Sequence, residues 1–425
     1  MVTPSNSGPT RIAYLLSQYP AISHTFFLNE VLLMRERGFS IETASVNSIH
    51  PPAGGFPEDE MREAARTFYI KETPKGRILK ILLETLIRRP GVVRRGLSAA
   101  LALRPWDLPG MAYSLFYLVE AILLGEWMQR RGCTHLHVHF GGSVATVGML
   151  TSIAWEIPYS LTIHGPEEFY DVGSSFLEQK LRQASFVTCI SDFCRSQLYK
   201  IAPVTSWGKF EVCRLGVRTA VFTPPPETAR ETLHIVSVGR LHPAKGQMIL
   251  LGSIRELLDR GLQVRLSIVG DGDGRSSLEQ FIETHDMKGS VTLHGALSHP
   301  ATRALLGTAD LFVLPSFAEG VPVALMEAMS MRVACISTFV AGIPELIEPG
   351  TQGLLVPPSS QTHLTEAMAS LIEDASHRKA LATAGREKVL SSYDLYTNIG
   401  KLSKVFERHG VIGSSPETPA PEVAS

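Results

Sequence analysis

The sequence predicts an α/β protein with two Rossmann-like domains, each built on a parallel sheet, that face an interdomain cleft. The 425-residue chain is too long for one ordinary hydrophobic core. Short apolar runs alternate with helix-length amphipathic segments, which is typical of parallel strands covered by helices on both faces. The alternation restarts near residue 234, after a proline-rich stretch at residues 215–225 that suits an interdomain linker.

Strands are expected where the apolar runs are short, and helices where apolar residues recur at helical spacing. The expected strands are Arg11–Leu16, His135–Phe140, Tyr159–His164, Phe186–Ile190, His234–Val238, Val264–Gly270, Val291–His294, Leu311–Pro315 and Val333–Ser337. Helical patterns lie between them, for example over Gln247–Arg260, Ser276–Asp286 and His299–Gly307.

The domain boundaries follow from this alternation. We expect an N-terminal domain over residues 1–217, with a basic and apolar helical insert at about 72–130. A C-terminal domain is expected over residues 218–390, followed by a helix over 391–410 that packs back on the N-terminal domain. Residues 411–425 are rich in Pro, Glu, Ser and Ala and are expected to form a disordered tail.

The composition narrows the class of protein. Because 40 Lys and Arg residues balance 41 Asp and Glu residues, the net charge of −1 gives no reason to expect a nucleic-acid partner. The five cysteines are scattered and contain no CxxC pair, which argues against a disulfide framework or a zinc site and fits a reducing cytosol. The N-terminus has no long apolar segment followed by a cleavage site, so we expect a cytoplasmic protein without a secretory signal.

The insert combines basic and apolar residues. Between Lys75 and Trp106 eight Lys and Arg residues accompany a single acid, Glu84, and apolar residues lie between them. Such a segment either lies on an anionic membrane surface, here the inner face of the cytoplasmic membrane, or packs its apolar face on the N-terminal domain. The apolar run that follows, Met111–Trp127, is interrupted by Glu120, which favours a buried helix over a membrane-spanning one.

Two glutamates follow the strand-like run near residue 311. Glu319 lies in the loop after this run, Pro322 is suited to open a helix, and Glu327 lies about a turn and a half into that helix. A first-turn carboxylate that stabilises the helix dipole would explain Glu319. It would not explain Glu327, whose apolar neighbours indicate burial, so a ligand hydroxyl is a suitable partner for this carboxylate.

In this strand–loop–helix context the two glutamates resemble the E-x7-E motif of family-4 retaining glycosyltransferases, which have the GT-B fold. The resemblance implies that Glu319 contacts hydroxyls of the donor sugar and that Glu327 hydrogen-bonds the ribose of the nucleotide. It also implies that Gly320 and Val321 line the donor site.

Residues 238–246 resemble the G-R-x-x-x-x-K-G element of the same family. The resemblance implies that Arg240 and Lys245 hold the donor diphosphate and neutralise the charge that develops as the sugar–phosphate bond breaks. Two surface cations in a loop are the simpler alternative. The flanking Gly239 and Gly246, together with the glutamate pair downstream, favour the functional interpretation.

A glycine-rich loop follows the strand-like run at residue 264. Gly270 and Gly272 would let backbone N–H groups approach a phosphate closely. The glycine spacing is not that of a dinucleotide fingerprint, which argues against a dehydrogenase. Asp271 and Asp273 spell the D-x-D metal motif of the other glycosyltransferase fold, but their position among GT-B motifs predicts no metal site.

Histidines mark two strands of the N-terminal half. His164 ends a buried strand, and α/β proteins place ligands at the carboxyl ends of parallel strands. The family resemblance places a histidine there that faces the transferred sugar; a strand-end histidine capped by backbone is the alternative. His135, His137 and His139 share one strand face, but no acidic or Cys partner follows at ligand spacing, so we expect a structural strand and no metal.

The resemblance covers residues 11–46, 134–170 and 185–390 and leaves out the insert. The N-terminal segments look like those of bacterial exopolysaccharide (colanic-acid-type) glycosyltransferases. In the first loop Tyr19-Pro20 stands where many members have a Gly-Gly pair, so acceptor contacts are not carried over for this loop.

The sequence therefore predicts a retaining glycosyltransferase that moves a hexose from a nucleoside diphosphate sugar to a saccharide or lipid-linked saccharide acceptor, in exopolysaccharide or cell-envelope glycan synthesis. The resemblance implies a reaction without metal or other cofactor, in which the donor phosphate is leaving group and base. Two alternatives stay open: a sugar-nucleotide epimerase of the same two-domain fold, and a non-catalytic nucleotide-sugar-binding protein. Detection of a glycosylated acceptor would distinguish the glycosyltransferase from the epimerase and from the binding protein.

Overall fold

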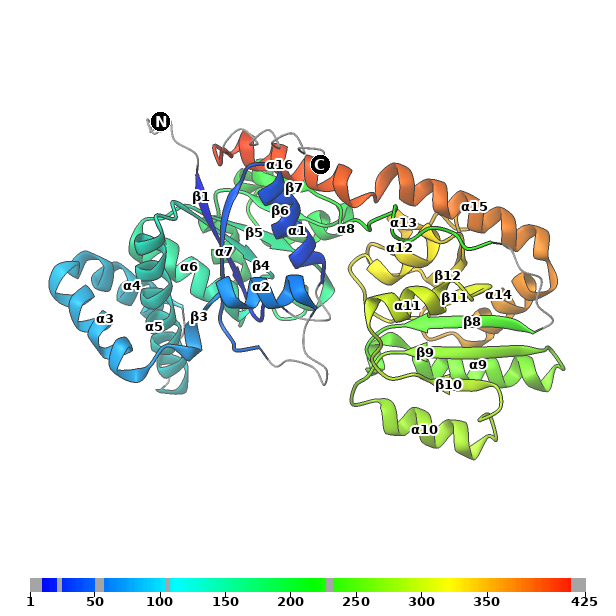
Figure 1. Ribbon diagram of the computed structural model, residues 1–425. Coiled ribbons are helices and arrows are strands. Elements are labelled where there is room, and N and C mark those ends of the chain that lie inside the picture. Colours follow the sequence, from blue (N-terminus) through cyan, green and yellow to red (C-terminus); the bar gives the residue numbers. More distant parts are fainter. Residues whose placement is uncertain (1–9, 21–24, 50–56, 104–107, 227–231, 414–425) are drawn as a thin grey trace, which may run out of the picture. The chain divides into compact units, whose positions relative to one another are not determined.

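The computed structural model describes residues 10–20, 25–49, 57–103, 108–226 and 232–413, and two parallel sheets organise them (Figure 1). The predicted tail therefore lies almost entirely outside the described residues, as do the last residues of the basic segment.

The chain divides into two compact units. Unit 1 comprises residues 1–190, 195–213 and 399–425, and unit 2 comprises residues 191–194 and 214–398. The last helix begins in unit 2 and ends in unit 1, because the division falls between residues 398 and 399.

Unit 1 contains a seven-stranded sheet in the order β3-β2-β1-β4-β5-β6-β7, and all neighbouring strands are parallel. Its strands are β1 (Arg11–Leu16), β2 (Ser40–Ser45), β3 (Phe68–Tyr69), β4 (His135–His139), β5 (Tyr159–Ile163), β6 (Val187–Cys189) and β7 (Phe210–Val212). Every residue of β4 and β5 is buried, as expected for central strands covered on both faces.

The helices of unit 1 connect these strands. They are α1 (Thr25–Glu36), α2 (Glu58–Arg66), α3 (Lys75–Arg88), α4 (Pro90–Ala102), α5 (Leu108–Arg131), α6 (Ser143–Trp155), α7 (Leu177–Gln183), most of α8 (Asp192–Ile201) and the end of α16 (Leu395–Arg408), with 3₁₀ turns η2 (Ile70–Glu72), η3 (Pro166–Phe169) and η4 (Val204–Lys209). The predicted insert corresponds to η2 and helices α3–α5, which pack on one another and on α6 (Figure 1).

One helix of the insert is long and apolar enough to cross a bilayer by length and composition alone. This helix covers Gly110–Arg131 of α5, and no other helix of the described residues meets both conditions. Half of its apolar stretch is buried inside the protein, where α5 packs against α4 and α6.

Unit 2 contains a six-stranded parallel sheet in the order β10-β9-β8-β11-β12-β13. Its strands are β8 (Leu233–Val238), β9 (Val264–Val269), β10 (Val291–Leu293), β11 (Leu311–Leu314), β12 (Ala334–Thr338) and β13 (Leu354–Val356). Counted within the unit this is the order 3-2-1-4-5-6, in which the direction of strand addition reverses between β8 and β11. Ligands of open α/β sheets bind outside the carboxyl ends of the strands at such a reversal.

Helices cover both faces of this sheet (Figure 1). They are α9 (Gln247–Asp259), α10 (Arg275–Thr284), α11 (His299–Leu306), α12 (Val323–Ser330), α13 (Ile343–Leu346), α14 (Gln361–Glu373) and α15 (Ala375–Ser392), with the 3₁₀ turn η5 (Pro243–Lys245). A continuous core of buried aliphatic side chains from the sheet and from α9, α10, α14 and α15 fills the space between them.

The predicted fold class is confirmed, and all nine predicted strands are present with ends that differ by no more than one residue. Strands β2, β3, β7 and β13 were not among the predictions. Three of them have only two or three residues, and β2 carries polar residues at buried positions, so neither an apolar run nor an alternation marks them in the sequence.

The last helix supplies an aromatic side chain to the core of unit 1. Phe406 is fully buried, and its ring centroid lies 5.0 Å from that of His137 on β4 and 5.1 Å from that of Phe186. The end of α16 therefore belongs to the core of unit 1.

We expect Phe406→Ala to destabilise unit 1 by about 3–5 kcal/mol, because it leaves a cavity against β4. Hydrogen exchange of the β1 and β4 amides should accelerate, and the thermal unfolding midpoint should fall. Lys404→Ala, at an exposed position on the same helix, is the matched control and should change stability by no more than about 0.5 kcal/mol. Equal exchange in the two variants would show that α16 does not support the sheet.

Candidate functional site

The carboxyl ends of β8 and β11 bring two predicted site residues together. Lys245 ends the turn η5 after β8, and Glu319 lies in the loop after β11. The Lys245 Nζ atom lies 2.5 Å from Glu319 Oε1, and the hydroxyl of Ser316 donates to the same oxygen at 2.8 Å. The Lys245 and Glu319 side chains are 20% and 9% exposed, so the ion pair is largely shielded but reachable from solvent.

Backbone packing keeps these two loops in close contact. Gly246 has φ +67°, and a Cβ atom there would lie 2.2 Å from the carbonyl oxygen of Pro315. The amide of Phe317 also donates to the carbonyl of Ala244 at 2.7 Å. Only glycine fits at position 246, and this is what allows Lys245 to reach Glu319.

The glycine-rich loop after β9 packs on the loop that carries Arg240. Gly270 has φ +137°, and an added Cβ would lie 1.9 Å from the carbonyl oxygen of Gly239. A Cβ atom added at Gly272 would likewise lie 2.4 Å from the carbonyl oxygen of Leu241. Both glycines are thus required by the approach of two loops, whatever ligand their N–H groups meet.

Arg240 presents an exposed side chain on this loop. Its carbonyl accepts a hydrogen bond from Nε2 of the buried Gln247 at 2.8 Å, which ties the loop to the first turn of α9. The backbone at Arg240 is therefore fixed, while its guanidinium faces solvent at the carboxyl edge of the sheet.

Glu327 lies in α12, whose N-cap is Pro322 as the sequence predicted for the helix start. The residue is 9% exposed, and burial raises the pKa of its carboxyl to about 7. Among the residues that the structure describes, no side chain or backbone group hydrogen-bonds this carboxyl. A buried acid without a partner is costly, so its position favours a ligand that supplies hydroxyl groups.

The residues between the two glutamates are held by the loop after β12. The amide of Gly342 donates to the carbonyl of Gly320 at 3.1 Å, and Val321 is buried. A Cβ at Gly342 would lie 2.7 Å from both that carbonyl oxygen and the Val321 side chain. The backbone of Gly320 and Val321 is therefore positioned from two sides.

Next to this loop Glu345 binds a segment that sequence reasoning did not single out. Its carboxylate accepts from the amides of Asp192 and Phe193 at 3.0 and 2.7 Å, and from Arg214 Nη2 at 3.0 Å. Arg214 also pairs with the Asp192 carboxylate at 2.7 Å. No local sequence pattern predicts this cluster, because its members lie far apart in the sequence.

His164 belongs to unit 1, whereas the other predicted site residues all belong to unit 2. It directly follows β5, is 7% exposed, and its Nε2 lies 3.1 Å from Nδ1 of His139. The strand-end position predicted for it is therefore correct, and a neighbouring strand contacts its ring.

Two charged residues that the sequence analysis missed, the half-buried Glu168 and the buried Lys180, hold the loop of His164. Glu168 accepts from the amides of His164 and Gly165 at 2.7 and 2.9 Å and from the amide of Gly141. Lys180 donates to the carbonyls of Gly141 and Gly142 at 2.8 and 2.7 Å. Burial raises the pKa of Glu168 to about 6 and lowers that of Lys180 to about 7.

The histidines of β4 form hydrogen bonds with hydroxyl groups of β5. His137 bonds Ser160 through Nδ1 at 2.8 Å and Thr162 through Nε2 at 2.9 Å, and His135 bonds Ser160 at 2.8 Å. Burial lowers the pKa of His135 to about 3 and that of His137 well below its usual value, so both rings are neutral.

A carboxylate, Glu30, completes this cluster from α1. Its Oε1 accepts from the hydroxyl of Tyr14 at 3.1 Å and lies 3.3 Å from Nε2 of His139. The group Glu30, His137 and His139 could geometrically hold a metal ion. Both ring nitrogens of His137 already have hydroxyl partners, however, so the arrangement fits a hydrogen-bonded core, and the predicted lack of a metal stays a prediction.

Comparison with known proteins identifies related sequences. Residues 224–388 match the family model for glycosyl transferases group 1. The putative colanic acid biosynthesis glycosyltransferase WcaL of Escherichia coli (strain K12) is 28% identical over 392 residues, which cover 89% of this chain and 95% of WcaL. The amylovoran biosynthesis glycosyltransferase AmsK of Erwinia amylovora is 26% identical, over 94% of this chain and 99% of AmsK.

Solved structures share the fold. Sucrose-phosphate synthase (tll1590) from Thermosynechococcus elongatus superposes with a TM-score of 0.73 at 16% identity, covering 94% of this chain and 98% of that one. Anabaena Alr3699/HepE in complex with UDP-glucose gives a TM-score of 0.72 at 15% identity, covering 93% and 99%. The GT-B fold expected from the sequence is thereby confirmed.

The buried carboxyl of Glu327 leads to a pH-dependent prediction for the ligand-free protein. Because its pKa is raised in the folded state, wild-type stability should be unaffected below about pH 4.5 and should fall as the pH rises to about 7, by up to about 3 kcal/mol. Glu327→Gln should remove this loss, so thermal unfolding should show a variant that matches wild type at pH 5 and exceeds it at pH 8.

Glu373→Gln, at an exposed position of unit 2, is the control and should follow the wild-type profile. If the stability of wild type and Glu327→Gln changed with pH in the same way, the raised pKa of Glu327 would be contradicted.

Proposed function

We propose that this chain, whose residues 224–388 match the family model for glycosyl transferases group 1, is a glycosyltransferase. It transfers a hexose from a nucleoside diphosphate sugar with retention of anomeric configuration. The acceptor is a saccharide or a lipid-linked saccharide of an exopolysaccharide or cell-envelope glycan. The names of WcaL and AmsK support this acceptor class. The observation that carries the proposal is the Lys245–Glu319 pair at the reversal of the unit 2 sheet.

The donor diphosphate lies against Arg240 and Lys245. As the bond between the anomeric carbon and the phosphate oxygen breaks, negative charge grows on the diphosphate, and the two cations stabilise it without a metal. The acceptor hydroxyl attacks the anomeric carbon on the same face, and its proton passes to the departing phosphate. Neither Arg240 nor Lys245 needs to change its protonation state in this step.

Glu319 orients the donor sugar through hydroxyl hydrogen bonds. Its Oε1 already accepts from Lys245 and Ser316, which fixes the carboxylate in place and leaves Oε2 to the sugar. Glu327 accepts from the ribose hydroxyls, and this hydrogen bonding to the ionised carboxylate favours the charged form that burial otherwise disfavours. His164 of unit 1 contacts the transferred sugar.

The helices α3 and α4 bind an anionic membrane surface on the cytoplasmic side. On α3 only Ile81 and Thr85 are buried, whereas Leu79, Leu83, Leu86 and Ile87 are 60%, 49%, 53% and 76% exposed. These four lie at helical spacing on one face of α3, which stays exposed while the opposite face packs on α4 and α5.

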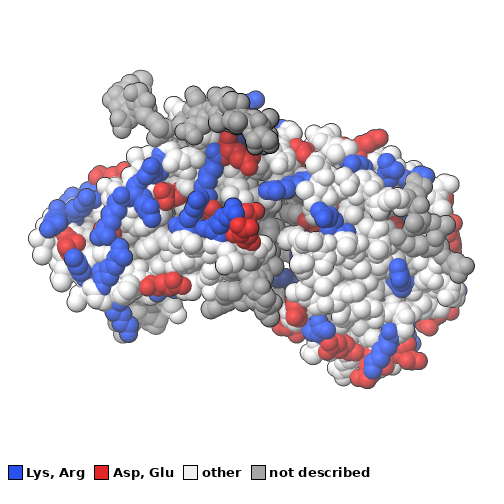
Figure 2. Space-filling view, viewed as in Figure 1, with Lys and Arg blue, Asp and Glu red and all other residues white. Residues whose placement is uncertain are grey.

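Lys and Arg side chains gather over the same two helices (Figure 2). Lys75, Arg77, Lys80, Arg88 and Arg94 are all exposed there. Apolar side chains that enter the headgroup region, next to cations that meet anionic lipid, are the combination that holds a peripheral helix on a bilayer.

We expect Glu319→Ala and Lys245→Ala each to lower transfer by about a hundredfold or more while the protein stays folded. Nucleotide release from UDP-, GDP- and ADP-sugars, with octyl glycosides as acceptor probes, measures transfer, and circular dichroism checks folding. Lys288→Ala, which removes a fully exposed ion pair of unit 2, is the matched control and should retain activity. Near-wild-type transfer by either site variant would refute the site assignment.

The membrane proposal predicts weaker flotation with liposomes that contain anionic lipid. Replacing Arg77, Lys80, Arg88 and Arg94 by Gln should lower binding at least about tenfold, since each cation near the surface contributes about 1 kcal/mol. Arg95 is left unchanged because its guanidinium bonds the carbonyl of Ala154.

A variant with Gln at four exposed cations elsewhere serves as the charge-matched control; these cations are Arg265, Lys288, Lys379 and Lys404. Equal flotation of the two variants would remove the argument for α3 and α4.

A further inference from the structure

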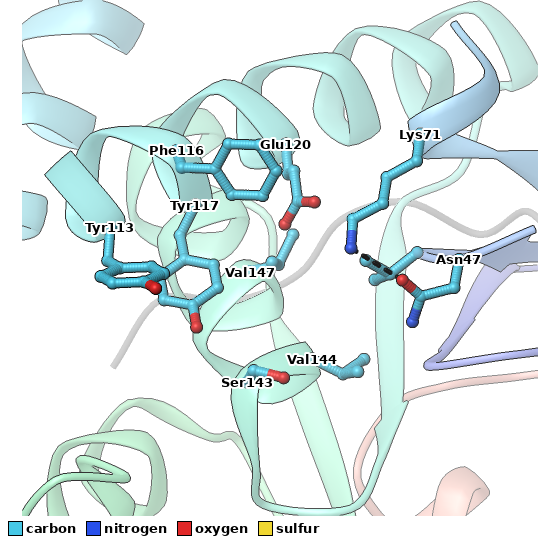
Figure 3. A pocket seen from close by; sticks show the side chains of 10 residues that line it. Asn47, Lys71, Tyr113, Phe116, Tyr117, Glu120, Ser143, Val144 and Val147 are labelled. Atoms are coloured by element: carbon cyan, nitrogen blue, oxygen red, sulfur yellow. Dashed lines mark hydrogen bonds between the residues drawn. The ribbon is translucent and has the colours of Figure 1, made fainter.

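Unit 1 contains a pocket that none of the predicted site residues lines (Figure 3). It lies between α5, the start of α6, the turn η2 and the residues that follow β2, and it has a volume of about 200 Å³. Small-molecule sites commonly measure roughly 300–1,000 Å³, so this pocket suits a single small ring rather than a whole oligosaccharide.

A buried acid faces the pocket. Glu120 of α5 is 4% exposed, and its Oε1 atom has no hydrogen-bond partner among the described residues. Burial raises the pKa of this carboxyl to about 7, although the charge of Lys71 acts in the opposite direction. An unsatisfied buried carboxyl costs stability, and a ligand hydroxyl in the pocket would offset this cost.

A fixed cation lies on the other side of the pocket. Lys71 Nζ donates to Oδ1 of Asn47 at 2.7 Å and lies 5.9 Å from the centroid of the Phe116 ring. Figure 3 shows the Lys71 side chain extending towards the pocket opposite Glu120. The pocket therefore offers a hydrogen-bond donor and an acceptor at separate, defined positions.

Aromatic rings of α5 form the third part of the lining. Phe116 is 50% exposed, and Tyr117 follows it on the same wall (Figure 3). The C–H groups on one face of a pyranose ring are apolar and pack on an aromatic face, while its hydroxyls point outward to polar partners. Aromatic walls with a few polar groups at fixed positions are what a small-molecule site needs.

We propose that this pocket binds one uncharged pyranose ring of the acceptor glycan. The ring stacks on Phe116 and Tyr117, one hydroxyl donates to Glu120, and another accepts from Lys71. The proposal rests on the transferase function proposed above. It is supported by the position of the pocket, since Asn47 follows β2 and Ser143 follows β4, at the same carboxyl edge of the sheet at which His164 follows β5.

Saturation-transfer NMR on the full-length protein tests the proposal, with the methyl α-glycosides of glucose, galactose and mannose as probes. We expect at least one probe to receive saturation from wild type, and the signal to fall at least about fivefold in Glu120→Met and in Phe116→Ala. Glu120→Met should also raise the thermal unfolding midpoint, because it removes a buried carboxyl without changing the length of the side chain. A residue with only a structural role would not combine higher stability with lost binding.

Two controls locate the bound ring. Glu319→Ala should keep the signal, which separates this pocket from the donor-sugar site, and Tyr396→Ala should keep it because this exposed aromatic lies in unit 2. The proposal is overturned if wild type gives no signal with any probe, if Glu120→Met and Phe116→Ala keep the signal, or if Glu319→Ala loses it. If Glu120→Met does not fold, Lys71→Met takes its place, with the same expected loss of the NMR signal and no expected rise of the unfolding midpoint.

Donor binding separates failure of this inference from failure of the proposed function. Thermal shifts with UDP-, GDP- and ADP-sugars should be the same in Phe116→Ala and wild type. Wild type that binds and turns over a donor but no methyl glycoside refutes the pocket alone, whereas wild type that binds no donor refutes the transferase proposal. If Phe116→Ala weakens liposome flotation and leaves the NMR signal intact, the ring contacts lipid and the sugar site is refuted.

Discussion

The approach of two backbone loops at the middle of the unit 2 sheet is the constraint on which the candidate donor site depends. The order of parallel strands reverses between β8 and β11, so the loops after these strands lie side by side at the carboxyl edge. Gly246 removes the one side chain that would keep the loops apart, and Lys245 can then meet Glu319. Gly270 and Gly272, in the loop after the neighbouring strand β9, allow the same close approach to the loop of Arg240.

In unit 1, polar side chains hold the loops at the carboxyl edge of the sheet. Glu168 and Lys180 bind backbone amides and carbonyls of the loops after β4 and β5, and so they hold His164 at the end of its strand. His135 and His137 on β4 are neutral because burial lowers their pKa values, and hydroxyl groups of β5 hydrogen-bond their rings. Two of the three histidines that share this strand face, His135 and His137, are thus held by hydrogen bonds within one sheet.

The acids of the two units differ in whether protein groups hydrogen-bond their carboxyls, but an unbonded oxygen alone does not mark a site, because Glu60 of α2 has one as well. The buried Glu63 bonds Arg35 at 2.6 Å, and the half-buried Glu168 accepts from backbone amides. Glu327 and Glu120 are 9% and 4% exposed, and burial raises the pKa of each carboxyl to about 7. One lies in the unit that carries the donor motif and the other in a pocket lined by aromatic rings, which suits a transferase that must hold two sugars.

By itself the sequence determined the fold class and nine of the strands, because apolar periodicity and glycine or proline positions are local signals. It also placed Lys245 and Glu319 in loops after strands and Glu327 in the helix that follows. Only the tertiary structure decided which of these residues meet, since the Lys245–Glu319 pair spans 74 positions of sequence. The exposed apolar face of α3, the cluster at Glu345 and the pocket at Glu120 were likewise undetermined. Burial and hydrogen-bond partners depend on neighbours that are distant along the chain, and no local pattern encodes them.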